Sequence, residues 1–266
     1  MSFIKNDKIG CSFIVNIEAE MVSCFVSSDV LMFIALTAFA YECPHYANTV
    51  FNATARQAIV DKHNELRATL INGTTPMLDG QHAKSGKNIY KILYDCDLEK
   101  QSQQWADLCV YEHSPQNYRN GGENIWELFT TGKLGHPVPY ALSAIMSWWN
   151  EVMEIDNRTA DPSQNGYIFN GYIYEKASHW SQMAQDLTSH VGCGIRNCTT
   201  EGKWKNVLFV CEYRAQGNFN GGRIYEFGNG CTMDSECTLM PNSVCEKSTK
   251  LCVLVLFGNI FQNSIH

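Results

Sequence analysis

The cysteines are the first residues of this sequence that suggest a specific chemistry. Twelve occur in 266 residues, and a reducing cytosol would leave most of them as idle thiols. The spacings 193–198, 231–237 and 245–252 are wider than those of paired zinc-finger ligands. We therefore expect disulfides in an oxidising, extracellular compartment. The set expected to pair is Cys43, Cys96, Cys109, Cys193, Cys198, Cys211, Cys231, Cys237, Cys245 and Cys252.

The last four cysteines lie close together in a segment, residues 228–252, that contains little apolar sequence. Such a short segment cannot bury enough apolar area to become ordered by itself, so local cross-links must restrict its unfolded ensemble. We expect Cys231, Cys237, Cys245 and Cys252 to pair among themselves. The other six cysteines are expected to cross-link the main domain.

Short catalytic motifs are missing from the sequence. It has no His-Glu-x-x-His helix, no Gly-x-Ser-x-Gly elbow and no cysteine clearly free of pairing. His63 invites assignment as a metal ligand, but it shares a predicted helical face with Ile59 and Leu66. We interpret His63 as a core histidine with a satisfied ring nitrogen.

Helical periodicity predicts the elements that must position these residues. Thr54 and Gln57 have capping-box spacing at the start of a helix over residues 54–70, which ends at Asn72-Gly73. Apolar stripes predict three further helices. They span residues 98–112, 141–152 (after Pro137 and Pro139) and about 177–187.

Two apolar runs predict the strands of a small sheet. Residues 207–213 (VLFVCEY) form a nearly continuous apolar run that suits a strand buried on both faces, and residues 191–195 are expected to pair with it. Helices on either side of this sheet give an α/β fold, a three-layer αβα sandwich over residues 50–220. A small disulfide-rich C-terminal appendage follows it.

The N-terminal region contains a run of signal-peptide length. Residues 30–40 are apolar and uncharged and end in Ala-Phe-Ala, so we expect cleavage before Tyr41. The basic residues lie far upstream, which translation from Met21 or Met32, or an extension of the gene model, would explain. We therefore divide the chain into four parts. They are a signal peptide with its extension (1–40), a main domain (41–222), a cysteine-rich extension (223–252) and an apolar tail of unknown role (253–266).

Charge and hydropathy exclude two classes of partner. Twenty basic against 27 acidic residues give a formal charge of −7, so no broad basic surface is expected to bind nucleic acid. A mean hydropathy of −0.22 and the shortness of the apolar tail argue against stable membrane insertion. Four N-glycosylation sequons agree with secretion. They lie at Asn52, Asn72, Asn157 and Asn197.

Four motifs then carry a family resemblance. In order, residues 63–67 (HNELR), 122–125 (GENI), 179–183 (HWSQM) and 211–218 (CEYRAQGN) resemble the signatures of the CAP superfamily, which comprises cysteine-rich secretory proteins, antigen 5 and pathogenesis-related 1. The cysteine-rich tail is most similar to that of the nematode Ancylostoma-secreted-protein or venom-allergen-like branch. Two residues depart from the pattern. They are Gln185, where the family usually has Trp, and Glu212, which replaces a small polar or basic residue.

The resemblance implies a CAP fold whose central cleft holds two histidines and two glutamates. Carried over to this sequence, the tetrad is His113, Glu123, Glu151 and His179. His113 and His179 are then candidate ligands for Zn²⁺, bound weakly and without a structural role. The alternative is a polar network in which each carboxylate orients one imidazole. We expect no catalytic residue and no enzymatic activity.

The function implied by the resemblance is that of a secreted, non-enzymatic protein of a parasitic nematode that engages host proteins or immune cells. One alternative is an extracellular carrier of sterols or other lipids, with a pocket beside Trp148 and Trp149. We favour ordinary core packing for this aromatic stripe. The least favoured alternative is a zinc-dependent hydrolase that uses the histidine and glutamate cleft.

Overall fold

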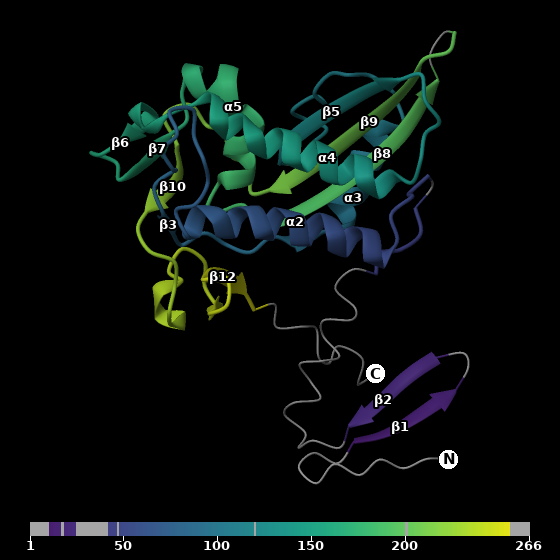
Figure 1. The fold of residues 1–266 in the computed structure, drawn as a ribbon, viewed down its shortest axis with the longest axis horizontal. Coiled ribbons are helices and arrows are strands. Elements are labelled where there is room, and N and C mark those ends of the chain that lie inside the picture. The colour runs from purple at the N-terminus through teal and green to yellow at the C-terminus, as the bar shows by residue number, and fades with distance from the viewer. Residues whose placement is uncertain are drawn as a thin grey trace, which may run out of the picture. The chain divides into compact units, whose positions relative to one another are not determined.

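The computed structural model describes residues 11–16, 19–24, 42–46, 48–119, 121–199 and 202–255 (Figure 1). The chain divides into two compact units, Met1–Glu42 and Cys43–His266. In the first unit, β1 (Cys11–Asn16) and β2 (Ala19–Cys24) form an antiparallel hairpin. The apolar run 30–40 with its predicted cleavage site, and the tail beyond residue 255, lie outside the described residues.

The main sheet of the second unit has the strand order β4-β8-β9-β5. β4 is parallel to β8, whereas β9 is antiparallel to both of its neighbours. The predicted pair of strands is confirmed, and each strand is longer than expected. Residues 206–213 of β9 are buried, as expected for a strand covered on both faces. The four strands are β4 (Leu93–Tyr94), β5 (Gly122–Thr130), β8 (His190–Thr199) and β9 (Lys205–Arg214).

Helices cover both faces of this sheet, which confirms the three-layer α/β sandwich (Figure 1). On one face, the Trp148 ring of α4 stacks on Phe209 of β9. On the other face, α3 packs so closely on β8 that a Cβ on Gly194 would lie 2.3 Å from the Cα of Gln103. The first layer contains α2 (Ala53–Ile71), α4 (Pro137–Asn150) and α5 (Gly171–Ala184), and the second contains α3 (Cys96–Ala106).

The ends of the helices differ from prediction for local reasons. Asn52, not Thr54, caps α2, because its side chain accepts a hydrogen bond from a first-turn backbone N–H at 2.9 Å. α3 ends at Ala106 instead of residue 112, because Cys109 takes a positive φ of 55° within its disulfide. α5 begins at Gly171, well before the predicted start at residue 177, and the side chain of Asn170 caps this end.

A second, smaller sheet lies in the same unit. Its strands are ordered β3-β10-β7-β6. β10, which lies beyond the predicted boundary at residue 222, pairs with β7 in this sheet. The strands are β3 (Gly86–Lys87), β6 (Ala160–Asp161), β7 (Gly166–Ile168) and β10 (Arg223–Phe227), and short 3-10 helices occur at η1 (Glu151–Glu154), η2 (Asn157–Thr159) and η3 (Asp234–Glu236).

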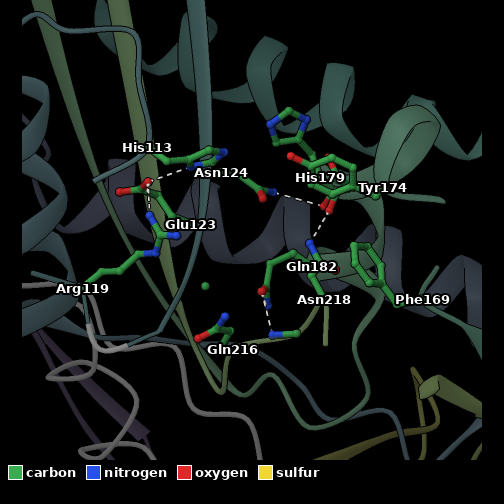
Figure 2. A pocket seen from close by; sticks show the side chains of 13 residues that line it. His113, Arg119, Glu123, Asn124, Phe169, Tyr174, His179, Gln182, Gln216 and Asn218 are labelled. Atoms are coloured by element: carbon green, nitrogen blue, oxygen red, sulfur yellow. Dashed lines mark hydrogen bonds and ion pairs between the residues drawn. The ribbon is translucent and has the colours of Figure 1, made fainter. Parts of the chain in front are cut away.

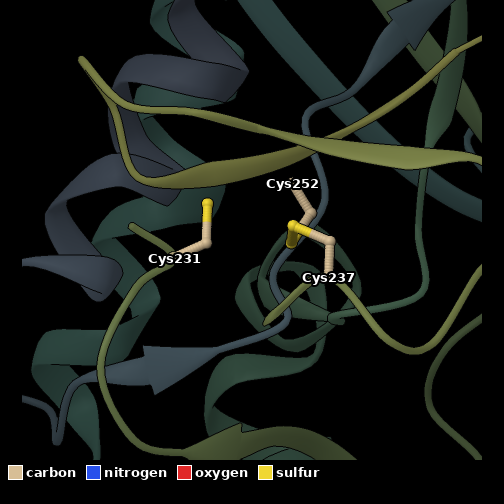
Figure 3. A group of neighbouring side chains, drawn as sticks. All are labelled: Cys231, Cys237 and Cys252. Atoms are coloured by element: carbon tan, nitrogen blue, oxygen red, sulfur yellow. A yellow bond between two sulfur atoms is a disulfide. The ribbon is translucent and has the colours of Figure 1, made fainter. Parts of the chain in front are cut away.

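The cysteine-rich extension is a short hairpin held by disulfides. β11 (Ser243–Glu246) pairs with β12 (Leu251–Leu254), so the strand runs past the predicted start of the apolar tail at residue 253. The sulfur atoms of Cys231, Cys237 and Cys252 lie within 4.8 Å of one another (Figure 3). They belong to two disulfides, Cys231–Cys245 and Cys237–Cys252, and are therefore not a metal site.

The remaining disulfides follow the expected partition, because none joins the extension to the main domain. They are Cys43–Cys96, Cys109–Cys198 and Cys193–Cys211. The described part of the chain contains no helix that is both long enough and apolar enough to cross a bilayer.

The structure distinguishes one glycosylation sequon from the other three. The Asn157 amide nitrogen, to which a glycan would attach, donates to Gln81 Oε1 at 2.8 Å and to the backbone oxygen of His82 at 3.1 Å, so both of its hydrogens are in use. The other three sequon asparagines are exposed. We expect glycans at Asn52, Asn72 and Asn197 and none at Asn157. Glycopeptide mass spectrometry of secreted protein checks this, and substantial occupancy at Asn157 would contradict it.

Candidate functional site

A cleft of about 270 Å³ opens at the N-terminal end of β5 (Figure 2). Three members of the predicted tetrad line it, His113, Glu123 and His179. Glu151, on η1, is not among the lining residues, but its carboxylate contacts His179 from behind. The other lining residues are Arg119, Gly122, Asn124, Phe169, Tyr174, Ser178, Gln182, Gln216, Gly217 and Asn218.

The first pair of the tetrad, His113 and Glu123, is held by one carboxylate oxygen that accepts three hydrogen bonds. Glu123 Oε1 accepts from His113 Nδ1 at 2.8 Å, from the Ser114 backbone N–H at 2.9 Å and from Arg119 Nη1 at 3.1 Å. The Glu123 side chain is fully buried, whereas that of His113 is 56% exposed. Burial alone would raise the pKa of Glu123, but these hydrogen bonds and the Arg119 charge lower it below its ordinary value. Glu123 is therefore an anion that orients His113.

The second pair, Glu151 and His179, lies at a kink in α5. Ala177 has non-helical angles (φ −150°, ψ 39°), so the following backbone N–H groups lack helical acceptors. Glu151 Oε2 accepts from the N–H groups of His179 at 2.9 Å and Trp180 at 3.1 Å, while its Oε1 accepts from His179 Nδ1 at 2.5 Å. One carboxylate therefore caps the second part of α5 and fixes the imidazole. It also complements the positive end of the helix dipole.

The aromatic stripe of α4 is core, as we had interpreted it. Trp148 is stacked between His179 at 5.8 Å and Phe209 at 5.5 Å, and its indole N–H donates to the backbone oxygen of Ile125 at 3.2 Å. Trp148 and Trp149 are only 2% and 3% exposed. The Trp148 ring thus lies against His179, and both indoles are packed in the core.

His63 is likewise a core residue, which confirms the sequence interpretation. Its Nδ1 donates to the backbone oxygen of Ile59 at 2.8 Å, and its Nε2 accepts from the Tyr213 hydroxyl at 3.0 Å. Burial lowers the pKa of His63 to about 4. The ring is therefore neutral and has no free lone pair for a metal.

Several lining residues were missed by the sequence reasoning. Gln182 and Asn218 lie inside the matched motifs and hold the cleft wall together, since Gln182 Oε1 accepts from the Gly217 N–H at 2.8 Å and Asn218 Nδ2 donates to the Ser178 backbone oxygen at 2.8 Å. Their place in the motifs could have identified them as site residues. No sequence feature pointed to Tyr174, because it lies in a helical turn that periodicity did not predict.

Comparisons with known proteins agree with this architecture. The model of the cysteine-rich secretory protein family matches residues 60–213. The chain belongs to this family. The Ancylostoma secreted protein of Ancylostoma caninum is 30% identical over 220 residues, which cover 79% of this chain and 46% of that relative. The chain thus spans about half the length of that protein.

Solved structures of family members extend the likeness to three dimensions. The structure of BmVAL-1 has a TM-score of 0.70 and 30% identity, and the match covers 81% of this chain and 100% of that one. The structure of NaASP2 with Zn²⁺ has a TM-score of 0.64 and 28% identity, and the match covers 79% and 100% of the two chains. This chain therefore shares the fold of secreted nematode-type family members.

The cleft leaves one nitrogen of each imidazole available. Because Nδ1 of His113 and of His179 is bonded to a carboxylate, each ring is the tautomer or cation with its proton at that nitrogen, and Nε2 remains for a ligand. Among the described residues, three potential ligand atoms come within 4.8 Å of one another only at the disulfide-bonded cysteines. A metal in the cleft would therefore have at most these two imidazoles as close ligands, with water completing its coordination.

Proposed function

We propose that this chain is a secreted protein of a parasitic nematode that acts by binding host proteins or immune cells, without enzymatic turnover. Its family and its likeness to secreted proteins such as that of Ancylostoma caninum support secretion. One observation carries the non-enzymatic part. Among the described residues, neither cleft imidazole is hydrogen-bonded to a serine, threonine or cysteine side chain that could act as a nucleophile, and each ring bonds through Nδ1 to a glutamate.

Binding and turnover are separated by one experiment. The disulfide-intact chain is immobilised and exposed to host serum and to immune-cell extracts, with the reduced and alkylated chain as a control for nonspecific capture. A partner that binds only the folded chain is then purified, and its saturable binding is measured. We expect the His113→Ala, His179→Ala variant to bind it unchanged if the contact is on the outer surface. A hydrolytic turnover that disappears in His179→Ala with the fold intact would contradict the proposal.

Metal binding is a second candidate property, favoured by the two free Nε2 atoms. The carboxylate behind each imidazole is the arrangement that orients histidine ligands and makes them more basic. These residues therefore fit Zn²⁺, and the related NaASP2 structure contains that ion. When bound, zinc would supply a Lewis acid to the cleft. The contribution of the chain is to hold the two rings through Glu123 and Glu151.

Zinc titration by calorimetry tests this property. We expect wild-type protein to bind Zn²⁺ and His113→Ala, His179→Ala to bind it at least tenfold more weakly, as about 1.4 kcal/mol or more of ligand contact is lost. Acidification should weaken binding, because a protonated imidazole offers no lone pair.

The matched control is His82→Ala, which removes an exposed histidine outside the cleft and should leave zinc affinity unchanged. Chelation should leave the fold largely intact and lower the melting temperature only by the small amount that weak binding contributes, because five disulfides hold the described fold without the ion. Equal affinity in wild type and double variant would place any zinc elsewhere.

A further inference from the structure

Glu212, one of the two residues that depart from the family pattern, is buried without a partner. It lies on β9, and its residue is 0% exposed. Its backbone N–H donates to Ser102 Oγ at 3.1 Å, but neither carboxyl oxygen has a hydrogen-bond partner. Leu208, Val210 and Glu212 are every second residue of β9, so their side chains lie on the same face of the sheet. Leu208 and Val210 pack against α3, and the Glu212 side chain therefore lies in the layer between the sheet and α3. A buried carboxyl without a partner is costly and needs an explanation.

The register of the sheet places a complementary group next to it. Glu212 is directly opposite Glu123 in the antiparallel pairing of β9 with β5. Directly opposite residues have Cβ atoms about 4.5–5.5 Å apart, which brings the ends of two glutamate side chains within reach of each other. Glu123 Oε2 is also buried and unpartnered, although Oε1 of the same carboxylate accepts three hydrogen bonds. Two carboxyl groups that each have an unpartnered buried oxygen therefore face each other across the strand pair.

The surrounding charges decide which of the two carboxyl groups is ionised. Glu123 is held as an anion by His113, Ser114 and Arg119. Burial and then the negative charge of Glu123 raise the pKa of Glu212 to about 8, against the opposing charges of Arg119 and Arg214. A protonated carboxylic acid offers one O–H donor, which is the group that Glu123 Oε2 lacks.

The other titratable group beside the pair adds no charge to it. On the loop that follows α3, burial is the first cause that raises the pKa of Tyr118, so this phenol is neutral. On the third strand of the sheet, the residue opposite Glu212 is Gly192, and α3 contributes the neutral Ser102. Apart from the two arginines, no cation is placed against Glu212 by these contacts.

We propose that Glu212 is protonated at neutral pH and donates its proton in a hydrogen bond to Glu123 Oε2, which makes it a positioning residue for His113. Both oxygens of Glu123 are then bonded, so its carboxylate cannot rotate, and the His113 ring that depends on Oε1 keeps its Nε2 directed to the cleft. Glu212 does not line the cleft and touches no ligand itself.

Nuclear magnetic resonance titration tests the proposal directly. In protein labelled with ¹³C at the glutamate carboxyl groups, we expect one resonance to titrate near pH 8 and to be absent from Glu212→Gln. Glu212→Gln keeps an N–H donor toward Glu123 and should leave the ¹⁵N and ¹H resonances of the His113 ring in place. Glu212→Leu removes the donor and should shift the His113 ring resonances while leaving those of His179 unchanged.

The control is Glu127→Gln, on the same face of β5, whose Oε1 accepts from Asn206 Nδ2 at 2.5 Å. It should leave the carboxyl resonance that titrates near pH 8 and the His113 ring resonances in place. A Glu212 carboxyl that is ionised at pH 6.5 would overturn the proposal, even if Glu212→Leu fails to fold. Unchanged His113 ring resonances in a folded Glu212→Leu would overturn the positioning role.

Discussion

Replacing Arg67 with methionine should lower the free energy of unfolding by about 3–5 kcal/mol. Arg67 is completely buried in α2, and its guanidinium donates only to backbone oxygens instead of to a carboxylate. Burial lowers the pKa of Arg67 to about 9, and the charge of Asp186 opposes this effect. The acceptors are the backbone oxygens of Tyr90 (2.8 Å), Met183 (2.5 Å), Gln185 (2.9 Å), Asp186 (3.3 Å) and Thr188 (3.2 Å).

The expected loss arises from these carbonyls more than from the arginine itself. Methionine fills part of the volume but leaves the backbone oxygens of Tyr90, Met183 and Thr188 without a donor, and each such buried acceptor costs about 1 kcal/mol or more. The oxygens of Gln185 and Asp186 still accept from backbone N–H groups. Arg67→Lys keeps the charge but loses the planar set of guanidinium donors, so its free energy of unfolding should lie between those of wild type and Arg67→Met. Lys62→Met, on the same helix but partly exposed, is the matched control. Chemical denaturation measures all three, and a loss below about 1 kcal/mol for Arg67→Met would contradict the expectation.

Local sequence signals located the elements whose ends are set locally. The helix predicted over residues 54–70 is α2, Ala53–Ile71, because periodic apolar residues and the Asn72-Gly73 pair specify it. The predicted end of α3 at residue 112 was wrong, because a disulfide to the distant Cys198 fixes Cys109 with a positive φ. The kink in α5 at Ala177 depends on Glu151, which lies in another element. Such distant constraints leave no periodic pattern in the sequence.

The contacts of the candidate site were even less predictable from local sequence patterns. His113 and Glu123 lie ten residues apart, and Glu151 and His179 lie 28 apart, without any helical or strand spacing between them. The family motifs supplied the four identities, but neither the pairing nor the role of Arg119 follows from spacing. Glu212 was noticed only as a departure from the pattern. Its position opposite Glu123 required the register of β5 on β9, which pairs segments 89 residues apart.

The largest pH-dependent effect is expected for Glu212→Gln. In the folded chain Glu212 keeps its proton up to about pH 8, whereas an ordinary glutamate loses it near 4.5. Its stabilising contribution is therefore fully present below pH 4.5. Between these values the folded state binds one proton more than the unfolded state, so the free energy of unfolding falls as pH rises, by up to about 1.4 kcal/mol per pH unit. Glutamine does not titrate and lacks this slope.

Denaturant unfolding of wild type and Glu212→Gln at half-unit steps from pH 4.5 to 9 measures the difference. The variant should gain stability over wild type steadily from about pH 5 to 8, and the difference should level off above pH 8, where both states of wild type have lost the proton. Contributions from Asp186, whose pKa burial raises to about 6, are common to both proteins and cancel. Glu127→Gln should lack this slope. A flat difference between wild type and Glu212→Gln would show that Glu212 is ionised in the folded chain, so that Glu123 would face a second negative charge instead of a hydrogen-bond donor.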